Sequence, residues 1–189
     1  MSPRQPLIRV LEEPVGPGDR VDILHTASLT AAALFAVHSM EDETIVSFAP
    51  SSPGDRDLAD RFVAASDVVT LTEADAARLY PGVAVDAVIG RLLRRGPALI
   101  AVECTRGWTL ETRCASLARP AASTAHRVVS GLLIGLADLW VDGCDAEELR
   151  SGLTTVRLDR IGQVFVAGES VARAAMRVPA AESHASPAA

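Results

Sequence analysis

The sequence predicts a three-layer α/β domain, in which a mostly parallel sheet is flanked by helices. Short runs rich in β-branched residues alternate with longer segments of helical apolar spacing, a pattern typical of parallel strands joined by crossover helices. Of the 189 residues, 49% are hydrophobic and 22% are charged, so the chain can bury a substantial core of its own. We therefore expect one α/β domain over residues 1–177, followed by a disordered tail at residues 178–189.

The first half of the chain supplies short strands and amphipathic or apolar helices. Leu7–Val10 fits a strand, and the turn-rich PVGPGD follows it. Three further strands and two helices are then expected in chain order: strand Val21–Leu24, helix Ser28–Met40, strand Thr44–Phe48, helix Asp55–Ala65 and strand Val68–Leu71. The residues T-E-A-D at 72–75 are typical of a capping box, which predicts a helix over Glu73–Leu79.

The second half continues the alternation. Its predicted elements are a helix at Val85–Arg95 closed by Gly96, an all-apolar strand at Ala98–Val102, an edge strand or hairpin arm at Thr109–Arg113, a long apolar helix at Thr124–Val141, and a helix beginning at Ala146 and capped by Asp145. Leu153–Val166 fits either a helix or a strand. We expect the four strands Val21–Leu24, Thr44–Phe48, Val68–Leu71 and Ala98–Val102 to be parallel neighbours in one sheet.

Charge and composition exclude several classes of function. The net charge of -6 argues against a general nucleic-acid footprint. Arg91, Arg94 and Arg95 form one basic cluster, whose helical spacing indicates a solvated helix face. All 18 basic residues are arginine, which excludes a P-loop lysine, a Schiff-base lysine and a Ser-Lys nucleophile pair. The sequence also has no G-x-S-x-G or G-x-G-x-x-G motif, so hydrolase and dinucleotide-binding readings lack support.

Cysteine usage and the apolar segments of the sequence indicate a cytoplasmic protein. The three cysteines form no C-x-x-C pair, and their odd number suggests reduced thiols. The first residues, MSPRQPLIRV, hold no apolar signal segment. The longest apolar stretch, Val128–Val141, falls short of the roughly 18–20 residues that a membrane span needs. We expect a cytoplasmic protein that binds neither membrane nor nucleic acid.

Five segments carry motif-like residues in a fixed order: VDILHTASL at 21–29, ETIVSFAPSS at 43–52, SDVVTLTEADAARLYPG at 66–82, RRGPALIAVECTRG at 94–107 and ASTAHRVVSGLLIGL at 122–136. Their order and spacing resemble the C-terminal half of ribokinase-like carbohydrate kinases, over roughly Val21 to Gly152. The resemblance implies a ribokinase-like fold truncated at the N-terminus. It also implies ATP and Mg²⁺ as cofactors if family chemistry is retained.

The chain departs from the family at its chemical positions. Where the family has G-A-G-D, with aspartate as catalytic base, this chain has Ser123, Thr124, Ala125 and His126. Asp75 stands at the glutamate position of N-x-x-E. Other replacements are Thr72 for the asparagine of the same motif, Ala49 for the aspartate of V-S-F-D-P-N, and Cys104 for the glycine of T-x-G, although Gly107 keeps a later glycine.

These departures define the candidate site. The resemblance places His126 at the catalytic-base position and makes Ser123, Thr124, Ala125, Asp75 and Gly107 candidate ligand contacts. Ordinary structural roles compete: Ser123 and Thr124 as N-caps, Asp75 as a capping-box partner, and His126 as a first-turn histidine. Residues with a Cβ cannot replace phosphate-cradling glycines cheaply. No metal site is predicted from the spacing of His25 and His38.

The leading hypothesis is a non-catalytic relative of carbohydrate kinases that binds an anion or phosphate or associates with another chain. The alternative is an ATP-dependent phosphotransferase acting on a sugar or nucleoside-like alcohol through an altered site. The third hypothesis is that the chain is a structural remnant of such a kinase and binds no ligand. A missing N-terminal half leaves sheet edge or helix surface uncovered, so we also expect a homodimer or a complex with another chain.

Overall fold

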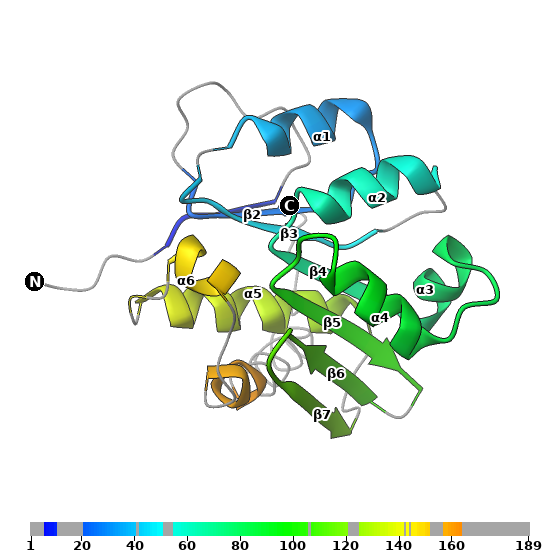
Figure 1. Ribbon diagram of the computed structural model, residues 1–189. Coiled ribbons are helices and arrows are strands. Elements are labelled where there is room, and N and C mark those ends of the chain that lie inside the picture. Colours follow the sequence, from blue (N-terminus) through cyan, green and yellow to red (C-terminus); the bar gives the residue numbers. More distant parts are fainter. Residues whose placement is uncertain are drawn as a thin grey trace, which may run out of the picture.

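The computed structural model describes residues 6–10, 21–40, 42–50, 55–105, 107–120, 125–141, 143, 145–151 and 157–163. Within them the strands form one sheet in the order of the chain (Figure 1): β1 (Ile8–Val10), β2 (Ile23–Thr26), β3 (Ile45–Phe48), β4 (Val68–Thr72), β5 (Leu99–Cys104), β6 (Gly107–Glu111) and β7 (Ser116–Pro120). β1 to β5 are parallel, whereas β6 and β7 are antiparallel to their neighbours. The prediction of four parallel neighbouring strands is confirmed.

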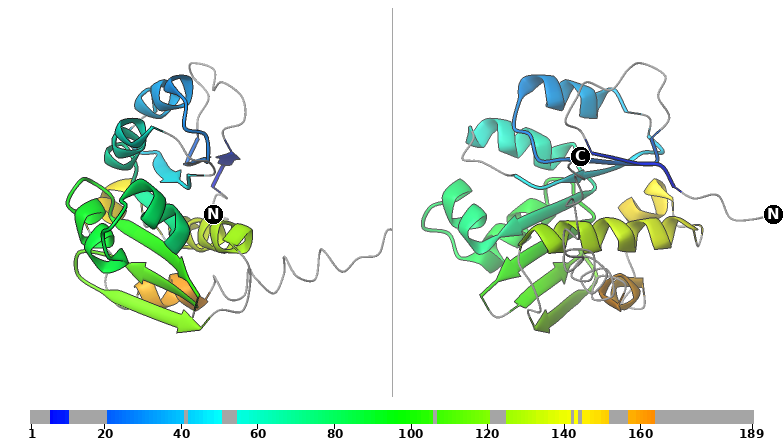
Figure 2. Two further views of the ribbon diagram at one scale, coloured as in Figure 1. Left: turned by 90° about the vertical axis from the view of Figure 1, so that its right-hand side faces the viewer. Right: turned by 180° about the vertical axis from the view of Figure 1, so that it is seen from behind.

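Helices cover both faces of this sheet, as Figure 2 shows from two sides. One face carries α1 (Ala31–His38), α2 (Arg56–Ala64), α3 (Glu73–Leu79) and α4 (Val85–Leu93). The opposite face carries α5 (Ala125–Val141), α6 (Ala146–Ser151) and a further helical segment at residues 157–163. The predicted three-layer α/β architecture is therefore confirmed.

The alternation of side chains along each strand builds a separate core on each face. On β4, Val69 and Leu71 join the core under α1 to α4, where the rings of Phe48 and Phe62 stack with centroids 4.9 Å apart. Val68 faces the other way, into the core under α5 and α6. Full burial of each such side chain contributes about 1.5–3 kcal/mol, so both layers hold the sheet.

Local signals set most of the observed boundaries. Thr72 and Asp75 form the predicted capping box at α3, and the Asp145 carboxylate accepts the Glu148 backbone N–H at the start of α6. Gly96 has φ +155, and a Cβ there would lie 3.0 Å from the Ala64 carbonyl oxygen. The connection from α4 to β5 thus crosses the end of α2 too closely for a side chain.

The structure corrects the sequence prediction in the C-terminal half of the sheet. β7 was not predicted, because SLARP has little strand character. The predicted segment Thr109–Arg113 is a hairpin arm and not an edge strand, since β7 pairs with β6 on its outer side. Thr112 stabilises the turn between them, where its hydroxyl accepts the backbone N–H groups of Cys114 and Ala115.

Other boundaries differ slightly or lie outside the described residues. β2 begins at Ile23 instead of Val21, and α4 ends at Leu93, two residues early. Residues 157–163 are helical, which decides part of the ambiguous segment Leu153–Val166. The predicted domain boundary at residue 177 and the tail lie outside the described residues. Within the described part of the chain, no helix is long and apolar enough to cross a membrane.

The direction of α5 positions its first turn. β7 runs parallel to β5 and ends at Pro120, which pairs with Gly107 beside Cys104, the last residue of β5. α5 begins five positions later, at Ala125. At its other end the chain leads to α6, where Arg150 reaches the starts of β3 and β4. α5 therefore begins at the carboxyl edge of the parallel strands and runs toward their amino edge.

Candidate functional site

The candidate site lies at the carboxyl edge of the sheet. Open α/β sheets bind ligands outside the carboxyl ends of their strands, and here β2, β3, β4 and β5 end at Thr26, Phe48, Thr72 and Cys104. The first turn of α5 begins at this same edge. A 17-residue helix presents backbone N–H groups and a positive dipole end there, the two features that attract anions.

The structure places only part of the predicted first-turn site. Ala125 is the first residue of α5 and His126 the second, and the described structure of these two residues is limited to their backbone. Ser123 and Thr124 lie outside the described residues. The contacts predicted for these side chains therefore stay predictions.

Asp75 forms the N-terminal capping box of α3 with Thr72. Its Oδ2 accepts the Thr72 backbone N–H at 3.0 Å and the Thr72 hydroxyl at 2.7 Å, while its own N–H donates to that hydroxyl at 3.0 Å. Its Oδ1 pairs with Arg78. With both carboxylate oxygens in use, the capping role accounts for Asp75, and ligand binding would require breaking these contacts.

Gly107 lies on the far side of a tight connection from β5. It begins β6 opposite Cys104, with φ +150. Glu73 of α3 stabilises this connection, because its carboxylate accepts the Thr105 backbone N–H at 3.2 Å. Burial first, and then the Glu73 carboxylate, raise the pKa of the Cys104 thiol, so at neutral pH it stays protonated and is a poor nucleophile.

A row of three polar side chains beneath α5 was not predicted from the sequence. His25, Ser47 and Thr70 alternate with the apolar residues of β2, β3 and β4 and lie on the face that α5 covers. The His25 Nδ1 lies 3.1 Å from the Ser47 hydroxyl, and burial lowers the pKa of His25 to about 4. This histidine is neutral at physiological pH.

Thr70 is the least satisfied member of that row. Its side chain is 7% exposed, and its Oγ1 is buried without a hydrogen-bond partner. A buried polar group without a partner costs about 1–3 kcal/mol and is uncommon enough to need an explanation, such as a bound ligand or water. Period-two alternation could have placed Thr70 on this face, but no sequence signal shows that its hydroxyl is unpaired.

Comparison with solved structures identifies the architecture. A fructokinase from Vibrio cholerae O395 matches 81% of this chain and 58% of its own at 15% identity, with TM-score 0.61. A fructokinase from Xylella fastidiosa with bound ATP matches 79% of this chain and 54% of its own at 17% identity, with TM-score 0.62. The chain has a ribokinase-like fold.

A third structure agrees: the E. coli protein termed Ribokinase II, in complex with ATP and Mg²⁺, matches 79% of this chain and 51% of its own at 15% identity, with TM-score 0.56. The chain spans little more than half the length of these ribokinase-like structures. Neither a protein-family model nor a curated protein matches the sequence. At these identities the likeness is one of fold.

The described residues do not fit the Mg²⁺ that a ribokinase-like kinase implies. Among them, no group of three or more His, Cys, Asp or Glu side chains is arranged to hold a metal ion. Asp75, the acidic residue at the family's N-x-x-E position, has both oxygens committed to Thr72 and Arg78. What the carboxyl edge offers is a helix start and polar side chains, which suit an anion better than a divalent cation.

Proposed function

We propose that this chain is a non-catalytic relative of carbohydrate kinases that binds a phosphate-bearing anion at the carboxyl edge of its sheet. One observation carries the proposal: the buried, unpartnered Thr70 hydroxyl lies on the face covered by α5, whose first turn begins at that edge. A hydroxyl can donate to a phosphate oxygen, and the first-turn N–H groups can do the same.

The residues at the chemical positions argue against turnover. Phosphoryl transfer needs metal, positioned phosphates and a base together. His126 replaces the family's aspartate, and Asp75 is held in a cap. Histidine can accept a proton, but general-base help is worth only about 10²–10⁴-fold and does not supply metal ligands.

Association with another chain is the second part of the proposal. β1 is one of the two edge strands in the described sheet. Leu7, just before it, and Ile8 and Val10 within it are 54%, 38% and 51% exposed. An exposed apolar edge of a sheet favours pairing with a further strand. We expect light scattering to show a dimer or a complex at tens of micromolar or so. A strictly monomeric protein would refute the proposed association with another chain.

A binding experiment tests the anion site. Calorimetric titration of the purified chain with inorganic phosphate should show weak, saturable binding, and Thr70→Val should weaken it. Because phosphate alone needs no metal, the titration is run with and without Mg²⁺, and the affinity should not change. Absence of saturable phosphate binding would refute the proposed anion site.

An activity assay separates this proposal from the phosphotransferase alternative. We expect no ATP-dependent phosphorylation of sugars or nucleosides by the unmodified chain, and none from His126→Asp, because the other replacements around it remain. Phosphorylation by the unmodified chain that His126→Ala abolishes would establish the enzyme instead.

A further inference from the structure

Tyr80, the single tyrosine of the sequence, is the centre of a second polar cluster on the opposite face of the sheet. It follows α3 and is 1% exposed. Its hydroxyl donates to Asp60 Oδ1 of α2, and Arg95 Nη1 lies 2.6 Å from Asp60 Oδ2. Burial, followed by the Asp60 hydrogen bond, raises the pKa of Tyr80 to about 12, so the phenol keeps its proton.

Two arginines from different helices lie over the same ring. The guanidinium carbons of Arg56, at the start of α2, and Arg91, in α4, are each 5.1 Å from the Tyr80 ring centroid. The neighbouring helices that carry them are seen in Figure 1. A guanidinium over an aromatic ring is attracted by the π-system and keeps N–H groups with which it can bind an anion.

The cluster carries an excess of positive charge. Both oxygens of Asp60 are already used, by Tyr80 and by Arg95. Within the described residues, Arg56 and Arg91 make no ion pair, although Asp57 follows Arg56 on α2 and Asp86 lies in the first turn of α4. Two like charges near one ring repel each other, and a bound anion would relieve that repulsion.

We propose that Arg56 and Arg91, held by Tyr80, form a binding site for a phosphate group. A phosphate presents several strong acceptor oxygens and can accept paired N–H bonds from more than one guanidinium, which a single carboxylate does less well. The site lies among α2, α3 and α4, on the face of the sheet opposite α5. It is therefore separate from the carboxyl-edge site and does not rest on it.

The single tyrosine makes the test specific. The protein is labelled with ¹³C in the tyrosine ring and titrated with inorganic phosphate, with sodium chloride of equal ionic strength as the salt control. We expect saturable shifts of the Tyr80 ring signals with phosphate and not with chloride. The double variant Arg56→Gln/Arg91→Gln should weaken this binding by about tenfold or more, since both charge-assisted contacts are lost.

Matched variants decide what the result means. Arg61→Gln/Arg94→Gln removes the same charge from exposed arginines of α2 and of the end of α4, and it should leave the affinity within about twofold. Arg56→Lys/Arg91→Lys keeps the charge and should bind more weakly than wild type, because lysine lacks the paired N–H edge. Thr70→Val should leave the Tyr80 titration unchanged even if it weakens binding at the carboxyl edge.

Three outcomes would overturn the proposal. The first is no saturable shift of the Tyr80 signals with phosphate. The second is equal affinity in wild type and in Arg56→Gln/Arg91→Gln. The third is an equal loss in Arg61→Gln/Arg94→Gln, which would show a general charge effect.

Discussion

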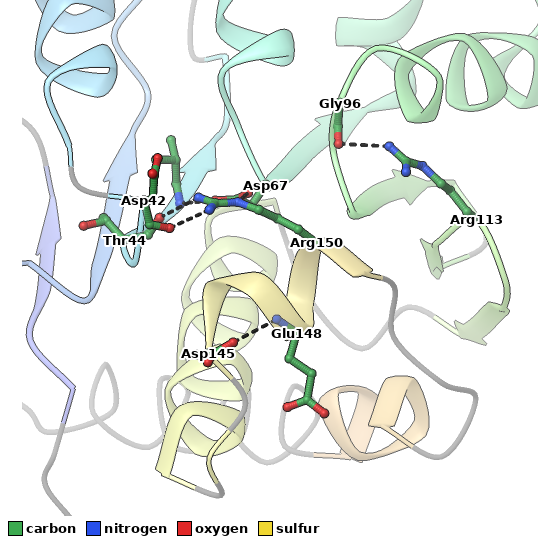
Figure 3. Close-up of polar contacts among 9 residues, drawn as sticks. Asp42, Thr44, Asp67, Gly96, Arg113, Asp145, Glu148 and Arg150 are labelled. Atoms are coloured by element: carbon green, nitrogen blue, oxygen red, sulfur yellow. Dashed lines mark hydrogen bonds and ion pairs between the residues drawn. The ribbon is translucent and has the colours of Figure 1, made fainter.

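The buried polar groups near the two edges of the parallel sheet differ in how completely they are paired. At the amino edge, Asp67 is 6% exposed, and its Oδ2 accepts the Val46 N–H at 2.8 Å while its Oδ1 accepts Arg150 Nε at 2.6 Å. Arg150 also donates to the backbone carbonyls of Asp42 and Thr44, as Figure 3 shows. One arginine of α6 thus fastens the starts of β3 and β4.

At the carboxyl edge, the α3 cap holds Thr72 through Asp75, and Glu73 accepts the Thr105 N–H after β5, but the polar side chains beneath α5 are less completely paired. Thr70 keeps a buried hydroxyl without a partner, and His25 is desolvated with one neighbouring hydroxyl. Natural proteins concentrate unsatisfied polar groups where they bind or act and satisfy them elsewhere. The amino edge is therefore built for stability, whereas the unpaired Thr70 hydroxyl supports the ligand site that we propose at the carboxyl edge.

The largest expected effect follows from breaking the amino-edge fastening. Arg150→Leu leaves the Asp67 carboxylate buried with only one hydrogen bond. Removing one partner of a buried ion pair costs about 3–5 kcal/mol, and because the Arg150 side chain is 40% exposed we expect about 2–3 kcal/mol. Urea unfolding of the two proteins measures this difference.

An exposed ion pair on the same side of the sheet is the matched control. Arg160 and Asp138 lie 2.9 Å apart with side chains 44% and 37% exposed, so Arg160→Leu should cost less than about 1 kcal/mol. Adding Asp67→Asn to Arg150→Leu should recover part of the lost stability, because the unpaired charge is removed. Equal costs for Arg150→Leu and Arg160→Leu would show that the amino edge is not specially fastened.

The amino-edge fastening also shows the limits of sequence reasoning. Local signals predicted the layers, the four parallel strands and the caps at Thr72 and Asp145, because alternation and capping depend on near neighbours. The contact between Arg150 and Asp67 joins residues 83 positions apart, and Arg56 and Arg91 meet only at Tyr80. Such pairings come from packing, and no local pattern contains them.

The start of α5 was predicted correctly, and the ligand site at that start stays a prediction. The resemblance predicts a site at the start of α5, and this start lies at the carboxyl edge of the sheet. Asp75 is a capping residue, as the T-E-A-D pattern allowed. Thr70 was overlooked, because whether a hydroxyl finds a partner depends on the surrounding side chains and not on the strand that carries it.

A smaller effect should appear at the carboxyl edge as pH falls. Burial lowers the pKa of His25 from 6.5 to about 4, so between these values the unfolded chain binds more protons than the folded one. The stability that depends on neutral His25 is fully present above pH 6.5. As the pH falls toward 4, the free energy of unfolding decreases by up to about 1.4 kcal/mol per pH unit.

Chemical denaturation at several pH values between 4 and 7 measures this loss. His25→Gln should flatten the dependence, whereas His38→Gln, at an exposed position of α1, should leave it as in wild type. If His25→Gln retained the full slope, another group would be responsible, and His25 would not be the desolvated member of the carboxyl edge.

The smallest effect gives the sharpest comparison, because one substitution is made at each edge. At the amino edge the Thr44 hydroxyl donates to the Val21 carbonyl at 2.7 Å, so Thr44→Val leaves a buried acceptor unpaired and should lower the free energy of unfolding by about 1 kcal/mol. At the carboxyl edge Thr70→Val removes a hydroxyl that has no partner and should leave stability unchanged or raise it by up to about 1 kcal/mol. Both threonines are buried, so the change in apolar burial is similar and largely cancels between the two variants.

Urea unfolding without phosphate measures the difference in stability between Thr44→Val and Thr70→Val. A loss of stability in Thr70→Val as large as that in Thr44→Val would mean that the Thr70 hydroxyl is already satisfied in the folded chain, and the carboxyl edge would then lose the observation on which its ligand site rests.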